Sequence, residues 1–353
     1  MQQKIVPHQT ARNSQDLLDA GLISQNQAKD IDQTSENFSM AITPEMMELI
    51  NPDDPNDPIA RQFIPSLEEF NVLPEEFADP IGDEPFTKVK GIVHRYPDRL
   101  LLKPLHVCAV YCRFCLRREQ VGSDGEGLSP TELEEALDYI RSHSEVWEVI
   151  LSGGDPLILS KSRLSYIIRA LDTIEHVEVI RIHTRVPVVA PSRVDAEMVQ
   201  ALKVKTPVYV VLHANHPREL TEEAIAACDQ LVDHGIPMLS QSALLKGIND
   251  DPQTMAQLMR RLTRARVKPY YLHHGDLAQG TSHFRTSIEE GQAIMRSLRG
   301  DLSGLCQPTY VLDIPGGHGK VPIGPTYLQK EGEGDRYQVE DPWSNLHTYP
   351  PTI

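Results

Sequence analysis

The chain has 353 residues, of which 40% are hydrophobic and 24% charged, values ordinary for a globular protein with a sizeable core. Its formal net charge of −16 argues against an extended nucleic-acid or anionic-membrane surface, although a local cationic site can coexist with an acidic exterior. Residues 1–15 lack the apolar core of a secretory signal, and no run of about 18 apolar residues occurs anywhere. We therefore expect a cytoplasmic protein without a membrane or nucleic-acid partner.

Residues 1–90 are polar, acidic and rich in proline. Two short stretches within them, 13–24 and 43–50, begin with the residues typical of helix starts. The stretch 51–65 carries several X-Pro and Asx-Pro turn signals, so we expect it to run over a surface. The pattern predicts a partly helical amino-terminal extension that wraps the core.

From residue 91 the pattern changes to short β-rich runs that alternate with longer helical segments. The predicted strands are 99–105, 148–153, 177–184, 208–214, 237–245, 268–274 and 309–314. The predicted helices are 130–143, 162–174, 195–204, 221–235, 251–265 and 287–300. Repeated β–α units predict an α/β fold with a parallel sheet and functional residues at the carboxyl ends of its strands. We expect a partial (β/α)6-type barrel over 91–325, with a flat doubly wound sheet as the alternative, and a short tail, 326–353, packed across the barrel edge.

Three of the five cysteines lie within eight residues, in the stretch HVCAVYCRFCLRRE (106–119). Cys108, Cys112 and Cys115 could form one face of a helix, since they stand at i, i+4 and i+7. A structural zinc site usually requires four ligands in two pairs, whereas an iron–sulfur cluster held by three thiolates leaves one iron open. The cluster fits the missing fourth ligand best. Cys228 and Cys306 lie in apolar runs and are interpreted as buried core thiols.

Three further stretches have both a structural and a chemical interpretation. LSGGDPL (151–157) fits a tight turn capped by its aspartate, and HRYPDR (94–99) fits a turn with solvated arginines or an anion site. DIPGGHGKVPIGP (313–325), rich in glycine around one lysine, fits a surface turn. A phosphate-binding loop is the chemical interpretation, but the stretch lacks the phosphate-loop spacing and no helix follows it.

CAVYCRFC resembles the C-x-x-x-C-x-x-C signature of radical S-adenosylmethionine (SAM) enzymes, and LSGGDPL follows it at the end of the next predicted strand. The resemblance implies a radical SAM barrel whose three cysteines, Cys108, Cys112 and Cys115, bind a [4Fe–4S] cluster with SAM on the open iron. It implies that the glycine-rich stretch approaches the SAM methionyl group through Gly153, Gly154 and Asp155.

The stretch 313–325 resembles the lysine-bearing loop of the lysine 2,3-aminomutase family, and similar stretches run from about residue 40 to about 327. They include MAITP (40–44), TRVPVV (184–189), HANHP (213–217) and QSALLKGIND (241–250). The resemblance implies that Lys320 is catalytic and binds pyridoxal phosphate (PLP) covalently. It further implies that the cofactors are bound by Arg95, Tyr96, Arg99, His213 and Gln241.

The same resemblance points to lysine as the substrate. Asp276 and Asp313 match the two aspartates that bind the lysine ε-ammonium, and Arg117 matches the arginine that pairs with the substrate carboxylate. Two acidic residues would repel the side chain of glutamate, so an enzyme for that substrate should not keep both. The sequence departs from the family at His318, Glu119 and His273, and no cysteine follows Cys306 to form the zinc-binding tail of the long members.

We therefore expect an L-lysine 2,3-aminomutase, an isomerase that interconverts L-lysine and β-lysine through a 5′-deoxyadenosyl radical and PLP-dependent amino migration. The alternatives are an aminomutase that makes (R)-β-lysine for elongation factor P, a radical enzyme without PLP, and a protein that has lost catalysis and keeps the cysteines as a structural metal site. The expected partners are lysine and an electron donor such as flavodoxin or ferredoxin. Product chirality and the existence of a homo-oligomer stay open.

Overall fold

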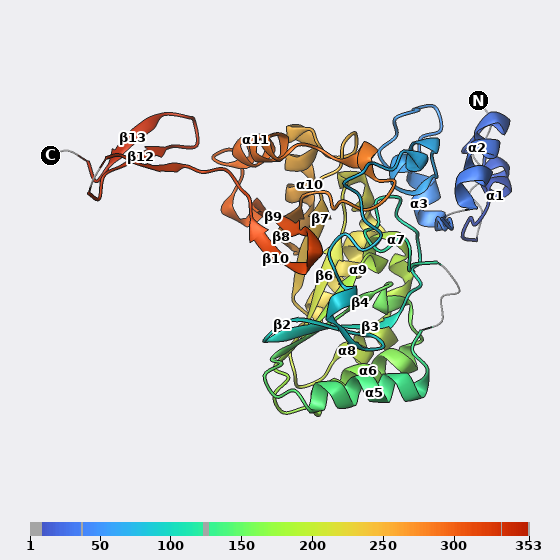
Figure 1. The fold of residues 1–353 in the computed structure, drawn as a ribbon. Helices are drawn as coiled ribbons and strands as arrows, with labels where there is room; N and C mark the ends of the chain where they lie inside the picture. The colour runs from blue at the N-terminus through green and yellow to red at the C-terminus, as the bar shows by residue number, and fades with distance from the viewer. Residues whose placement is uncertain (1–8, 37, 123–126, 333, 352–353) are drawn as a thin grey trace.

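A computed structural model of the chain describes residues 9–36, 38–122, 127–332 and 334–351 (Figure 1). One ten-stranded sheet forms its centre, and its strands are β1 (Thr87–Val89), β2 (Ile92–Tyr96), β3 (Arg99–Leu105), β4 (Glu148–Gly153), β5 (Val179–Thr184), β6 (Val208–His213), β7 (Met238–Ala243), β8 (Lys268–His273), β9 (Thr309–Ile314) and β10 (Gly319–Pro322). The helices of the core are α5 (Pro130–Arg141), α6 (Lys161–Asp172), α7 (Val186–Val189), α8 (Ala196–Leu202), α9 (Glu222–Asp233), α10 (Pro252–Arg264) and α11 (Ile288–Leu298).

The order of the strands confirms the partial barrel. Strands β3 to β9 pair in parallel, each with its neighbour in sequence, and β2 and β10 extend the sheet in antiparallel fashion. A doubly wound sheet would reverse its strand order near the middle, and this sheet never does. Strand β1 forms one edge of the sheet and β10 the other, so the barrel is open between them.

Local signals explain where the helices begin and which face they bury. Helix α5 starts with a capping box, in which the Ser129 side chain accepts from the Glu132 backbone and Glu132 reaches back, and with proline at its first turn. Its buried residues, Leu133, Ala136, Leu137 and Ile140, recur at helical spacing, so one stripe faces the sheet. The connecting helices thereby cover the outer face of the parallel strands.

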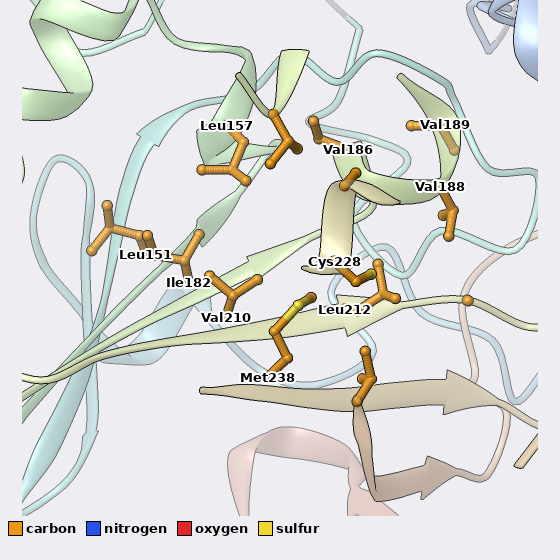
Figure 2. Close-up of a cluster of buried hydrophobic side chains, with 14 of the residues drawn as sticks. Leu151, Leu157, Ile182, Val186, Val188, Val189, Val210, Leu212, Cys228 and Met238 are labelled. Carbon is orange, nitrogen blue, oxygen red and sulfur yellow. The ribbon is translucent and has the colours of Figure 1, made fainter. Parts of the chain in front are cut away.

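The core between sheet and helices is one continuous apolar cluster. Figure 2 shows Leu151, Ile182 and Val210, from three neighbouring strands, pointing into the layer that also contains Cys228 of helix α9. Cys228 is fully buried and Cys306 is 6% exposed, which confirms that both are core thiols. Truncating a fully buried leucine such as Leu151 to alanine should cost about 2–5 kcal/mol.

The amino-terminal segment packs onto the barrel through four short helices, α1 (Ser14–Asp19), α2 (Gln25–Ser35), α3 (Pro44–Leu49) and α4 (Ala60–Phe63). Met46, Met47 and Phe63 are fully buried and belong to the same apolar cluster as the barrel. Helix α3 lies beside α7 (Figure 1), where the Thr43 hydroxyl donates to the Val189 carbonyl at 2.6 Å. The segment therefore contributes to the core as well as covering it.

The carboxyl-terminal segment differs from its expected place across the barrel edge. Strands β11 (Leu328–Lys330), β12 (Tyr337–Glu340) and β13 (Leu346–Tyr349) form a separate antiparallel sheet that projects away from α11 (Figure 1). Strand β12 pairs with both β11 and β13, and the segment contacts the barrel through the ion pair of Glu340 with Arg296 of α11, at 2.7 Å. Within the described residues, no helix is long and apolar enough to cross a membrane.

Candidate active site

Several of the expected functional residues lie at the carboxyl ends of the parallel strands, whereas Arg99 begins β3 and Arg95 and Tyr96 lie on the antiparallel β2. The cysteine loop follows β3, Gly153 ends β4, His213 ends β6, and Gln241 lies on β7 in register with His213. Asp276 follows β8, and Asp313 lies near the end of β9. Parallel strands bring these ends to one rim, so residues far apart in the chain become neighbours.

The cysteine stretch folds as a succession of turns, which excludes the interpretation as one helix face. The Cys115 amide donates to the Cys112 carbonyl at 3.1 Å, and the Arg113 amide donates to the Gln62 carbonyl at 2.9 Å. Burial raises the pKa of Cys115 to about 11, and the neighbouring Cys112 adds to the shift. Burial also raises the pKa of Cys108, with contributions from Asp155, Cys115 and Cys112. The three thiols therefore lie close enough for their charges to interact.

Among the described residues, no group of three His, Cys, Asp or Glu side chains is arranged around a single metal ion. Each cysteine of a [4Fe–4S] centre binds a different iron, so a cluster does not require its three ligands to converge on one ion.

A buried ion-pair network lies behind Cys112. Arg185, the residue directly after the end of β5 at Thr184, donates from Nη1 to Cys112 Sγ at 2.9 Å and from Nη2 to Gln62 Oε1 at 3.1 Å. The same guanidinium pairs with Glu219, which is fully buried. Glu219 in turn accepts from the Asn215 amide at 3.0 Å. The network thereby provides a fixed positive charge beside the sulfur of Cys112.

The glycine-rich turn after β4 is required by the chain's own packing. Gly153 has φ of +99°, a conformation that favours glycine. A Cβ on Gly154 would lie 2.3 Å from the Val107 carbonyl oxygen, so only glycine fits against the cysteine loop. Asp155 accepts from the Leu157 amide at 3.0 Å and the Thr184 hydroxyl at 2.7 Å. The turn therefore holds the cysteine loop in place, and Asp155 acts as the cap that its position suggested.

Lys320 lies opposite Asp313 because β10 pairs with β9 in antiparallel register. Its ammonium forms an ion pair with Asp313, and Nζ lies 3.2 Å from Nδ1 of His273. His273 Nδ1 is also 3.1 Å from Asp313 Oδ2. The Lys320 backbone amide donates to the Tyr96 hydroxyl at 3.0 Å, which fixes the lysine loop to β2.

The pKa values of the two aspartates of the site, Asp276 and Asp313, are shifted in opposite directions. Burial would raise the pKa of Asp313, but the hydrogen bond from His273 and the charge of Lys320 hold it below its usual range. Burial and the negative charge of Asp313 raise the pKa of Asp276 to about 7. Burial lowers the pKa of His273, helped by the charge of Lys320. Asp313 is therefore held ionised by its partners, whereas the pKa of Asp276 lies close to neutral pH.

Arg117 and Arg95 are both anchored by a carboxylate that the sequence analysis did not single out. Arg117 donates from Nε and Nη2 to Asp83 Oδ2, at 3.0 and 2.9 Å. Arg95 donates from Nη2 to Asp83 Oδ1 at 3.2 Å and to the Ile81 carbonyl at 2.7 Å. Its Nε is buried without a hydrogen-bond partner, which marks a donor available to an anion.

The two remaining expected residues, Arg99 and His213, lie in different parts of the site. Arg99 stacks on the ring of Tyr96 at 3.8 Å and pairs with Asp98 at 2.6 Å. His213 Nε2 lies 3.1 Å from Asn215 Oδ1, and burial lowers the pKa of His213 well below its ordinary value. Arg99 therefore lies with Tyr96 beside the lysine loop, while His213 faces the network around Glu219 and Asn215.

Sequence reasoning missed Arg185, Glu219 and Asp83. Arg185 follows the carboxyl end of β5, so the strand-end rule that found Asp276 could have found it. Glu219 lies in a 3-10 turn after β6, where no periodicity marks it. Asp83 precedes the first strand of the sheet and had no sequence signal of its function.

Two family models match the chain. The radical SAM superfamily matches residues 102–259, and the lysine-2,3-aminomutase carboxyl-terminal family matches residues 295–336. The L-lysine 2,3-aminomutase of Clostridium subterminale is 43% identical over 306 residues, which cover 87% of this chain and 74% of that protein. A putative L-lysine 2,3-aminomutase of Aquifex aeolicus is 43% identical over 89% of this chain and 88% of its own. The glutamate 2,3-aminomutase of Clostridioides difficile is 40% identical over 86% of this chain and 71% of its own.

Proposed function

The chain belongs to the lysine 2,3-aminomutase family of radical SAM enzymes, and we propose that it is itself an L-lysine 2,3-aminomutase, interconverting L-lysine and β-lysine. Relatives named for lysine and for glutamate have similar identity to it, 43% and 40%, so overall likeness does not choose the substrate. The choice rests on the side chains at the rim of the barrel.

The residues present suit the iron–sulfur cluster. Cys108, Cys112 and Cys115 would hold three of its irons through their thiolates, and the fourth iron would stay open for SAM. The cluster is anionic, and Arg185 already directs a donor to Cys112 Sγ at 2.9 Å. A radical enzyme of this kind needs an external electron, for which we propose a small donor protein such as a flavodoxin or ferredoxin.

The residues present also suit PLP. Lys320 supplies the primary amine, held at the end of a strand pair whose register puts it beside Asp313. Arg95 supplies a buried Nε without a partner, a donor suited to a phosphate oxygen. When bound, the cluster with SAM supplies a 5′-deoxyadenosyl radical and PLP supplies covalent activation of the substrate amino group.

The protein's own part in the reaction is to bind and orient the substrate. Arg117 would pair with its carboxylate, while Asp276 and Asp313 would bind its terminal ammonium. Asp313 Oδ2 accepts a hydrogen bond from Lys320 Nζ, so this carboxylate orients the amine within the site. Residues 79–86 contact both loops of the site: Asp83 accepts from Arg117 after the cysteines, and Gly82 packs against Gly316 and Gly317 of the lysine loop.

One observation supports lysine above glutamate: two aspartates share the far end of the site. Burial and the charge of Asp313 raise the pKa of Asp276 to about 7, although the charges of Lys320 and Arg117 act in the opposite direction. The ammonium of a lysine substrate would add a cation beside Asp276, whereas the side-chain carboxylate of glutamate would add a third negative charge.

The decisive experiment offers lysine, glutamate and alanine together to the anaerobically reconstituted enzyme. Products are separated and identified by mass. β-Lysine as the main product would support the proposal, and β-glutamate as the main product would refute it. The absence of any product, with iron and PLP both bound, would favour a protein that has lost catalysis.

A further inference from the structure

Asp83 is a buried carboxylate surrounded by three cations from three separate segments. It is 3% exposed, and its oxygens lie 2.9 Å from Arg117 Nη2, 3.2 Å from Arg95 Nη2 and 3.8 Å from Lys103 Nζ. Burial would raise its pKa, but the charges of Arg117 and Lys103 hold the pKa below the usual value. A buried, ionised carboxylate is stable only when it is paired in this way.

The contact with Arg117 uses only one edge of the guanidinium. Nε and Nη2 both donate to the same oxygen, Oδ2 of Asp83, at 3.0 and 2.9 Å. A guanidinium carries five N–H donors in one plane, so the hydrogens of Nη1 and the second hydrogen of Nη2 point away from Asp83. That second edge can bind another carboxylate while the first stays on Asp83.

The segment that carries Asp83 is fixed in place. Asp79 accepts from the Asp83 amide at 2.9 Å and from the Glu84 amide at 2.8 Å. A Cβ on Gly82 would lie 2.6 Å from both Gly316 C and Gly317 N, so this backbone touches the lysine loop directly. Asp83 therefore cannot withdraw when an anionic ligand arrives without displacing the loop that carries Lys320.

We infer that Asp83 is a positioning residue for recognition of the amino-acid carboxylate: it holds one edge of Arg117 so that the other edge faces the substrate. The inference rests on the proposed function, in which Arg117 pairs with that carboxylate. Through its second oxygen Asp83 also steadies Arg95, although Arg95 keeps its bonds to the Ile81 and Gly82 carbonyls. The amino-terminal segment thereby contributes to the active site.

The first test compares Asp83→Asn with Glu84→Gln, an exposed acidic neighbour that serves as the matched control. Asp83→Asn should raise the KM for lysine at least tenfold and change kcat less than about threefold, because orientation of a ground-state contact is lost. Asp83→Glu should recover part of the loss by restoring the charge, and Glu84→Gln should match the wild type. Iron content and melting temperature report whether each variant folds.

A second test asks whether Asp83 acts through Arg117. In an Arg117→Gln background, Asp83→Asn should add less than about twofold to KM, whereas independent structural roles would multiply their effects. An unchanged KM in Asp83→Asn, a fall confined to kcat, or fully multiplicative effects would each overturn the inference.

Equilibrium binding separates this inference from the proposed function. Lysine and glutamate are titrated by calorimetry into the PLP-loaded proteins, where both ligands present the same α-carboxylate. A tenfold weaker affinity of Asp83→Asn for either ligand supports positioning even if turnover shows that lysine is not the substrate. If both ligands bind Asp83→Asn as tightly as the wild type, the inference fails while the proposed function stands.

Discussion

Asp276 and Asp313 share one site, yet the pKa of Asp276 is raised to about 7 while that of Asp313 is held below its usual range. The difference arises because Asp313 has Lys320 and His273 as direct partners, whereas desolvation and the charge of Asp313 outweigh the charges of Lys320 and Arg117 at Asp276. On the proposed function, the ammonium of lysine would add a cation beside Asp276.

Replacing Asp276 by asparagine tests the substrate claim most directly, because Asp313 is also paired with Lys320. A hydrogen bond to a charged group contributes about 1.5–3 kcal/mol, so kcat/KM for lysine should fall roughly ten- to more than a hundredfold. Norleucine, which lacks the ε-amine, serves as the neutral comparison. Equal slowing of both substrates in steady-state assays would make Asp276 a structural residue.

The pKa of Asp276 predicts how lysine binding depends on pH. Below pH about 7 the carboxyl is protonated in the free enzyme, so binding an ammonium must release its proton. The dissociation constant for lysine should therefore fall nearly tenfold per pH unit up to about 7 and level off above. Calorimetry in buffers of different ionisation enthalpy measures the released proton. A slope that persists in Asp276→Asn would assign it to another group.

The raised pKa of Asp276 also predicts how the folding stability of the protein depends on pH. Between its unfolded value near 3.8 and about 7, Asp276 binds a proton in the folded protein and not in the unfolded one. The free energy of unfolding of the ligand-free protein should therefore decrease as the pH rises through this range. Asp276→Asn should flatten the decrease, as measured by denaturant unfolding at a series of pH values. An identical pH dependence in both proteins would contradict this.

Lys320 should carry the cofactor. Borohydride reduction of the PLP-loaded enzyme followed by peptide mapping should place the pyridoxyl label on Lys320, and Lys320→Ala should lose the label while keeping its iron. Lys103 is the rival within the site, since it is buried near Asp83 and Arg117. Lys268 is a distant control, because its amine donates to the carbonyls of Leu305 and Gln307. A label on Lys103 would require a new assignment.

The cluster should depend on the cysteine loop alone. Cys112→Ala should lose bound iron after anaerobic reconstitution, because one of three thiolates is removed. Cys228→Ala and Cys306→Ala should keep full iron content, since both thiols are buried in the apolar core and serve as matched controls. Loss of iron in Cys306→Ala would mean that a fourth thiolate closes the iron that SAM needs.

The sequence by itself determined the strands and helices of the barrel and indicated candidate residues for its chemistry, which stay predictions. Strand ranges such as 99–105 and 148–153 coincide with β3 and β4, because burial on both faces leaves continuous apolar runs. The helices followed from local caps and one-sided apolar spacing. Lys320 and Asp313 were recognised from one short stretch, and their contact follows from the register of a single hairpin.

Only the tertiary structure decided which side chains support those residues. Asp83 and Arg117 form a hydrogen-bonded pair although they are 34 residues apart in the sequence, and Arg185 and Cys112 do so at a separation of 73 residues. No local pattern encodes such pairs, because each partner has its own reason to be polar and only the packing of the segments brings them together. The placement of strands β11, β12 and β13 was also decided by the tertiary structure: their composition suggested a tail packed across the barrel edge, but they pair with one another in a sheet of their own. Local propensity thus determines the helices and strands. The pairs in the site depend on the tertiary structure, because a buried charge needs a partner and only the fold determines which residue is near enough to be one.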